Sequence, residues 1–119
     1  MKTHCFHLNP EPFASIQSGN KTIESRLYDA KRQVIQNGDS LTFYNRDDTN
    51  HFIVATVTQL HHYSSFHELF TSQPPKKFGK TSIEELERQI ALYYSPDDEE
   101  KYGVLGIEFD LSRTKTKTL

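Results

Sequence analysis

The chain has 119 residues, about the length of one folded domain, and its formal net charge of −2 excludes the strongly basic field of a protein that grips many phosphates. Hydrophobic residues make up 34% of the sequence and aromatic residues 12%, so phenylalanine and tyrosine rings must supply much of the buried area. Cys5 is the only cysteine, which excludes an internal disulfide, and we expect it to be a small buried apolar residue.

Nothing in the sequence predicts a targeting or membrane segment. Residues 1–6 lack an apolar stretch of signal-peptide length, and no window approaches the ~18–20 apolar residues that span a bilayer. We therefore expect a cytoplasmic protein without a membrane partner.

The first quarter of the chain predicts a strand, a helix and a second strand. Residues 3–8 form the first strand, and the Asn9-Pro10 step that follows is typical of a helix start, because proline fits the first turn. The Gly19-Asn20 pair ends this helix, since both residues tolerate left-handed backbone angles. Residues 21–26 then form a short strand, and a segment directly after such a stop is typical of the wall of a cleft.

A short helix and a hairpin follow in the middle of the chain. Asp29 caps a helix over residues 30–37. A strand over residues 41–44 and a longer one over residues 52–60 flank a polar hairpin loop at 46–50. Because the longer strand carries apolar residues on both faces, it should lie at the centre of the sheet.

Two further helices are indicated in the second half. One opens at Ser64 or Ser65. Another begins at a capping box formed by Thr81 and Glu84, three positions apart, and ends near Ser95 because Pro96 follows.

The last strand covers residues 102–109. Residues 112–119 are polar and show no periodicity, so we expect a disordered tail after a single domain of residues 1–111. The strand-rich order with dispersed short helices predicts an α+β fold, a compact barrel whose helices flank or plug its ends.

The strongest candidate site is the strand after the helix stop. Because side chains alternate along a strand, Thr22, Glu24 and Arg26 share one face, while the intervening residues take the other. Lys21 adds an ammonium group beside this face. Opposite charges on a solvated strand edge would contribute only ~0–1 kcal/mol, but the position after a helix stop favours a functional site.

These charges can do two kinds of chemistry. Lys21 and Arg26 can hold a phosphate or a polar base edge while Glu24 orients them. Alternatively, Glu24 can move protons while Lys21 acts as nucleophile or electrostatic stabiliser, which requires shifted pKa values in a dry pocket.

Aromatic residues near the C-terminus could supply stacking. Tyr94 and Tyr102 are candidates for stacking on a base, whereas Tyr93 belongs to the apolar face of the helix that precedes it. The basic loop with Lys76, Lys77 and Lys80 is solvent-exposed and can meet phosphates.

Histidines cluster in the sequence without the pattern of a metal site. His61 and His62 are adjacent on a strand and so point apart, and no carboxylate trio or cysteine pair completes a shell with His67. We therefore expect neither a metal nor another cofactor.

Several of these residues together resemble the ASCH domain family. Its Gly-x-Lys-x-x-Glu-x-Arg signature is present as Gly19, Lys21, Glu24 and Arg26, and the similarity runs over residues 8–109. The resemblance implies a PUA-like mixed β-barrel of five to six strands with short flanking helices, and a role in RNA binding. The fold alone does not fix that role.

Some small members that this chain resembles are amidohydrolases that release acetate from N4-acetylcytidine. They use a lysine, a threonine three positions later and a distant glutamate. Lys21 matches the lysine, but Glu24 stands where the threonine would be. The position expected for the distant glutamate falls near Phe78 and Gly79, so the glutamate is not matched there. Other members are linked to RNA cleavage, which a Lys-Glu-Arg cluster can support by acid–base action and phosphate stabilisation.

The leading hypothesis is that the protein binds RNA or a modified nucleoside, or a related nucleotide, in a charged cleft. The residues expected to form it are Lys21, Thr22, Glu24, Arg26, Tyr28, Tyr94 and Tyr102. The second hypothesis is a hydrolase acting on an acylated nucleoside or an RNA phosphodiester, with Lys21 and Glu24 as the reacting pair. A third is a protein-interaction module whose charged cleft is structural.

Overall fold

The computed structural model describes residues 1–116 of the protein, whose centre is one five-stranded sheet with strand order β1-β3-β4-β5-β2. The strands are β1 (Thr3–Leu8), β2 (Ile23–Leu27), β3 (Ser40–Asn45), β4 (Asp48–Tyr63) and β5 (Val104–Thr116). Only β1 and β3 pair in parallel, and the other neighbours are antiparallel. The predicted long central strand is therefore confirmed as β4, and β1 and β2 are the two edges.

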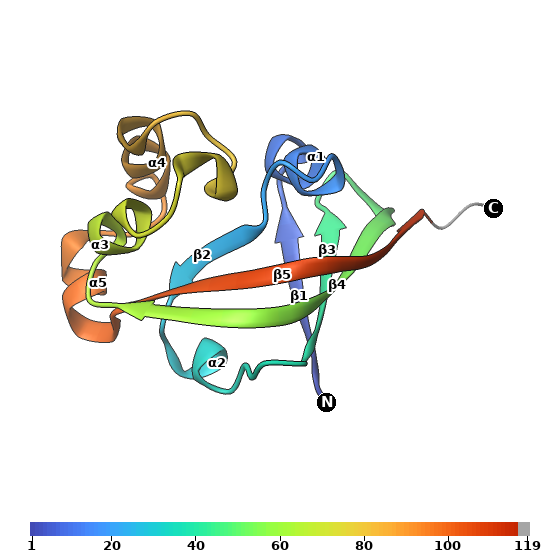
Figure 1. The fold of residues 1–119 in the computed structure, drawn as a ribbon, viewed down its shortest axis with the longest axis horizontal. Coiled ribbons are helices and arrows are strands. Elements are labelled where there is room, and N and C mark those ends of the chain that lie inside the picture. The colour runs from blue at the N-terminus through green and yellow to red at the C-terminus, as the bar shows by residue number, and fades with distance from the viewer. Residues whose placement is uncertain (117–119) are drawn as a thin grey trace.

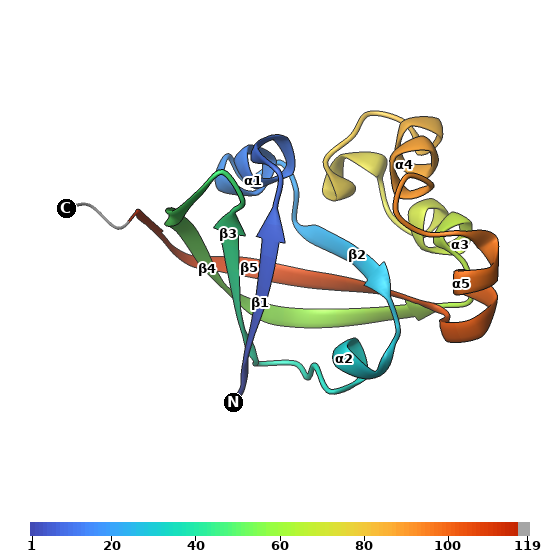
Figure 2. The ribbon, with the colours of Figure 1, turned by 180° about the vertical axis from the view of Figure 1, so that it is seen from behind.

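The sheet curls into a half-barrel with short helices around it, which confirms the predicted α+β, PUA-like fold (Figure 1). The helices are α1 (Pro10–Gln17), α2 (Ala30–Gln33), α3 (Phe66–Thr71), the 3₁₀ helix η1 (Pro75–Phe78), α4 (Ile83–Ile90) and α5 (Pro96–Tyr102). Seen from both sides, α3, α4 and α5 gather where β4 ends and β5 begins, while α1 lies near the tips of β1 and β3 (Figures 1 and 2).

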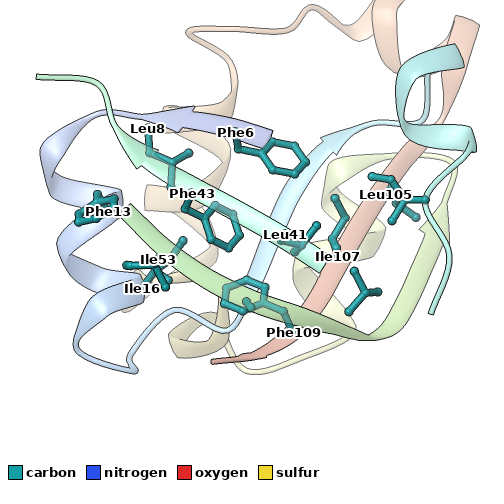
Figure 3. Packing of buried hydrophobic residues seen from close by; sticks show 13 residues of the cluster. Phe6, Leu8, Phe13, Ile16, Leu41, Phe43, Ile53, Leu105, Ile107 and Phe109 are labelled. Carbon is teal, nitrogen blue, oxygen red and sulfur yellow. The ribbon is translucent and has the colours of Figure 1, made fainter. Parts of the chain in front are cut away.

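Two apolar cores lie on the two faces of the sheet. The first fills the inside of the curl, and most of its members appear in Figure 3: Phe6, Leu8, Phe13, Ile16, Ile35, Leu41, Phe43, Ile53, Ala55, Val57, Leu105, Ile107 and Phe109. The second lies under α3, η1 and α4: Ile23, Leu27, Phe66, Leu69, Phe70, Phe78, Leu86 and Val104. Because β5 contributes to both cores, its side chains alternate between them.

β2 has the two-faced character that its sequence predicts. Ile23 and Leu27 pack into the second core. Glu24 and Arg26 point to the opposite face, where the Arg26 guanidinium lies 4.7 Å from the centre of the Phe6 ring. This strand therefore presents a charged face toward the first strand of the chain.

Some predicted boundaries are wrong for local reasons. The helix expected over residues 30–37 is a single turn, and Val34 just beyond it is 48% exposed. Cys5 is exposed rather than buried, because Phe6 and Leu8 fix the inward face of β1 and leave Cys5 on the outer one.

The helix α4 begins one residue later than expected and ends earlier. Ser82, not Thr81, is the cap, since its hydroxyl accepts the backbone N–H of Glu85 at 3.2 Å. The helix α5 was not predicted; it opens with its own capping box between Ser95 and Asp98.

The last strand is longer than predicted. β5 does not end at residue 109 but continues to Thr116, because the long arm of β4 offers a pairing partner as far as His51. Residues 112–116 therefore continue the sheet, and the rest of the tail expected to be disordered, residues 117–119, lies outside the described residues.

The absence of a side chain at Gly106 lets α3 lie close to the sheet. A Cβ atom at this position would stand 2.7 Å from Leu69 Cδ1 and 3.2 Å from Ile23 Cγ2. Gly106→Ala should therefore lower the free energy of unfolding by about 1–3 kcal/mol, measured by urea denaturation. In a Leu69→Ala background the added methyl has room, so the same substitution should cost much less. An equal cost in both backgrounds would contradict this packing.

Candidate functional site

A cavity of about 160 Å³ opens between the barrel and the helices, beside β2. Its apolar lining consists of Leu8, Pro12, Phe70, Phe78, Leu86 and Ile90. Its charged lining consists of Lys21, Glu24, Arg26 and Arg46. Since a cavity of ~150 Å³ holds one benzene ring, this one has the size for a single six-membered ring system.

Three of the predicted residues form a buried ionic cluster in this cavity, the Lys21–Glu24–Arg26 cluster. Lys21 Nζ lies 2.7 Å from Glu24 Oε1, and Arg26 Nε donates to Glu24 Oε2 at 2.7 Å. The Glu24 side chain is only 5% exposed, against 14% for Lys21 and 19% for Arg26. Oε1 has no hydrogen bond of good alignment among the described residues, so its pairing with Lys21 is ionic.

The two cations keep Glu24 ionised. Burial is the largest single effect and opposes ionisation, but the charges of Lys21 and Arg26 and their close contacts with the two carboxylate oxygens together outweigh it and lower the pKa of Glu24 from 4.5 to about 2. Burial likewise acts to lower the pKa of Arg26, yet Glu24 and, to a smaller extent, the neighbouring Tyr94 side chain raise it above its ordinary value. At neutral pH Glu24 is thus a charged acceptor and a poor proton shuttle.

Lys21 is held in place by two neighbouring segments. Its backbone N–H donates to Ser15 O at 3.0 Å, at the end of α1, and the next N–H, from Thr22, donates to Lys77 O at 2.8 Å. Gly79, with φ of 94°, packs closely against the lysine side chain, since a Cβ atom at this position would stand 3.3 Å from Lys21 Cβ and Cδ. The lysine stem is therefore directed toward Glu24 by backbone contacts on both sides.

The rim of the cavity carries residues that the sequence did not indicate. Arg46, in the turn between β3 and β4, donates to His7 O at 3.0 Å and to Asn9 Oδ1 at 3.1 Å. Asn9 Nδ2 in turn donates to Tyr93 Oη at 3.3 Å. Tyr93 is 57% exposed and lines the cavity, and is not buried on a helix face as predicted, because α4 ends at Ile90.

The predicted aromatic residues are separated by the fold. Tyr94 lines the cavity, with its ring stacked on Phe66 at 5.7 Å between centroids. Tyr28 instead packs against His62, with 4.1 Å between ring centroids, and Tyr102 lines a separate shallow depression near α5.

Thr22 is likewise not among the residues that line the cavity. It precedes β2 and fixes the segment through its backbone, since its carbonyl accepts the Phe109 N–H at 3.1 Å. The cavity thus unites Lys21, Glu24, Arg26 and Tyr94 and leaves the other three predicted residues outside.

Neither a metal cluster nor a membrane helix is found in the part of the chain that the structure describes. No three His, Cys, Asp or Glu side chains come together there in a way that could hold a metal ion. None of the helices within residues 1–116 combines the length and apolar character needed to cross a membrane.

Removing the charge of Glu24 should destabilise the fold. Glu24→Gln leaves two buried cations without their counter-charge and should lower the free energy of unfolding at pH 7 by about 3–5 kcal/mol, measured by urea denaturation. Glu84→Gln, on the exposed side of α4, is the matched control and should change it by less than about 0.5 kcal/mol.

The difference in free energy of unfolding between wild type and Glu24→Gln should also depend on pH. Because the pKa of Glu24 is about 2 in the folded protein and 4.5 ordinarily, its contribution is complete above about pH 4.5 and is lost as the pH falls through about 2. The gap in stability between wild type and Glu24→Gln should therefore narrow across this window. A gap that does not change with pH would contradict the ionised cluster.

The comparison with known proteins identifies the family. The ASCH domain model matches residues 6–113. The crystal structure of hypothetical protein PH0355 is 34% identical with a TM-score of 0.81, covering 93% of this chain and 99% of that one. The solution structure of protein PF0455 from Pyrococcus furiosus is 30% identical with a TM-score of 0.72, covering 92% and 97%.

A more distant structure shares the fold alone. ASCH from Zymomonas mobilis is 14% identical with a TM-score of 0.60, and the match covers 95% of this chain and 70% of that one. No curated protein matches. With the family model matching nearly its whole length, the chain belongs to the ASCH domain family.

Proposed function

We propose that this ASCH domain binds a single nucleobase, of RNA or of a modified nucleoside, in the cavity beside the Lys21–Glu24–Arg26 cluster. The observation that carries the proposal is the combination of a ring-sized cavity with a buried, ionised cluster at its wall. A flat heterocycle needs apolar contact on its faces and polar contact on its edge, and this cavity offers both.

The apolar contacts come from the helical side. Phe78, Leu86 and Ile90 line the cavity, and the half-exposed ring of Tyr93 stands at its entrance. Stacking of a base on an aromatic ring contributes about 1–3 kcal/mol and tolerates different bases. Tyr93 is therefore the residue best placed to cover the bound ring.

The polar contacts come from β2 and from Lys21. Arg26 uses its Nε–H for Glu24, which leaves guanidinium N–H groups for a ligand, and Lys21 keeps ammonium protons beyond the one directed at Glu24. Both cations can donate to a carbonyl oxygen or ring nitrogen. Glu24 fixes their positions, since each of its oxygens is already engaged by one of them.

The open edge of β2 adds a backbone donor and acceptor. Phe109 N–H donates to Thr22 O, and Tyr28 N–H donates to Gly103 O, so the even-numbered residues of β2 hydrogen-bond to β5. Because hydrogen bonding alternates along an antiparallel pair, the N–H and C=O of Ser25 point away from β5. Ser25 lines the cavity, so this pair can meet the donor and acceptor on a base edge.

Hydrolysis is the alternative, and one observation argues against its simplest form. A general base works best with a pKa near the working pH, whereas the pKa of Glu24 is about 2. A reaction in which Glu24 shuttles protons to or from Lys21 is therefore disfavoured.

Binding should depend on the ring and on the cluster. With the four ribonucleosides and N4-acetylcytidine as probes in calorimetric titrations, Tyr93→Ala and Lys21→Ala should each weaken the best binder by about tenfold or more. Tyr102→Ala and Lys31→Ala are matched controls, since both residues are exposed and neither lines the cavity. Thermal unfolding of each variant separates lost binding from lost folding.

Two results would overturn the proposal. One is a folded Tyr93→Ala or Lys21→Ala protein with unchanged affinity, and the other is a wild type that binds none of the probes nor a short RNA. Product analysis of the same mixtures tests the alternative. Release of acetate that disappears in Lys21→Ala would establish a hydrolase instead.

A further inference from the structure

Arg46 brings to the rim of the cavity a charge that base binding does not use. It is exposed, whereas Lys21 and Arg26 are largely covered, so it lies where a ligand would leave the cavity. Its two hydrogen bonds go to neutral oxygens, the His7 carbonyl and the Asn9 amide. Among the ion pairs of the described residues, none involves Arg46.

The cavity is positive although the protein is not. Its lining holds three permanent cations, Lys21, Arg26 and Arg46, against the single carboxylate of Glu24, with His7 counted as neutral. The chain as a whole carries a net charge of −2. A local excess of positive charge in an otherwise acidic protein favours a ligand that is itself an anion.

The guanidinium of Arg46 is already held in position. Its NH1 and NH2 groups each hold one hydrogen bond, and a guanidinium has five N–H donors, so several remain for a ligand. Arginine in a fixed orientation makes paired hydrogen bonds to the oxygens of a phosphate. Because the Arg46 side chain is already ordered, binding a ligand does not have to meet the entropy cost of ordering it.

Asn9 joins this charge to the stacking ring. Its Oδ1 accepts from Arg46 and its Nδ2 donates to Tyr93 Oη, so one amide spans the rim. The Tyr93 hydroxyl and the Arg46 guanidinium are thus linked through one side chain at the rim of the cavity.

We propose that Arg46 recognises a phosphate next to the bound base, so that the ligand is a nucleotide, free or within RNA, rather than a nucleoside. This inference rests on the proposed function. It adds the phosphate as a second recognition element and assigns it to a residue outside the family signature.

The test compares nucleosides with their 5′- and 3′-monophosphates in calorimetric titrations at low salt. For wild type, at least one monophosphate of the preferred base should bind about tenfold or more tightly than the nucleoside, as a charged hydrogen bond allows. Arg46→Gln should remove this gain, so that the variant binds the nucleoside and its monophosphates with equal affinity. Arg88→Gln, an exposed arginine of α4 outside the cavity, is the matched control and should keep the gain.

Two further measurements support the assignment without relying on one variant. Arg46→Lys keeps the charge but not the paired donors, so it should retain only part of the gain. In wild type the gain should shrink as salt rises from low to physiological concentration, because the rim is solvent-exposed.

The outcomes separate this inference from the proposed function. Equal affinity for nucleoside and monophosphates, or a gain that survives in Arg46→Gln, would overturn the phosphate role while leaving base binding intact. Absence of binding by every probe would overturn both. A dinucleoside monophosphate that shows the Arg46-dependent gain points to RNA as the source, and a gain confined to monophosphates points to free nucleotides; either result supports the inference.

Discussion

A buried carboxylate between two cations organises the site. Glu24 is almost fully covered, and only the simultaneous contacts of Lys21 and Arg26 make its charge tolerable there. Glu24 is therefore held by both cations, and each cation is held by Glu24. Their positions need the end of α1, the strand β2 and the turn at Gly79 to be in place together. The geometry of the site therefore depends on segments that are far apart in the sequence.

The two cores explain why such a cluster can exist beside an apolar cavity. β2 has to serve the second core with Ile23 and Leu27, so its alternate residues are turned toward the first strand. On that face the Arg26 guanidinium lies over the ring of Phe6. The cavity beside β2 is therefore lined by apolar side chains from the helices on one side and by charged side chains on the other.

The sequence predicted local patterns well and long-range neighbours poorly. The two faces of β2 follow from alternation alone, and Lys21, Glu24 and Arg26 are within six positions of one another, so their meeting could be foreseen. Arg46 could not be found, because only the pairing of β1 with β3 brings the β3–β4 turn to Asn9. Tyr93 was misplaced because a periodic apolar pattern does not say where a helix stops, and α4 stops at Ile90. Tyr28 and Tyr102 were selected for their residue type, but Tyr28, just after β2, packs against His62, and Tyr102, at the end of α5, lines a separate depression.

The strand order leaves β1 and β2 as the two edges, and both contribute to the cavity wall. In a closed barrel these edges would be joined by a seam of backbone hydrogen bonds; here the ring-sized space occupies that place. A molecule bound in this cavity would contact both edge strands and so bridge β1 and β2. Its binding free energy then adds to the cohesion of the sheet itself, which makes resistance to unfolding a direct reporter of occupancy.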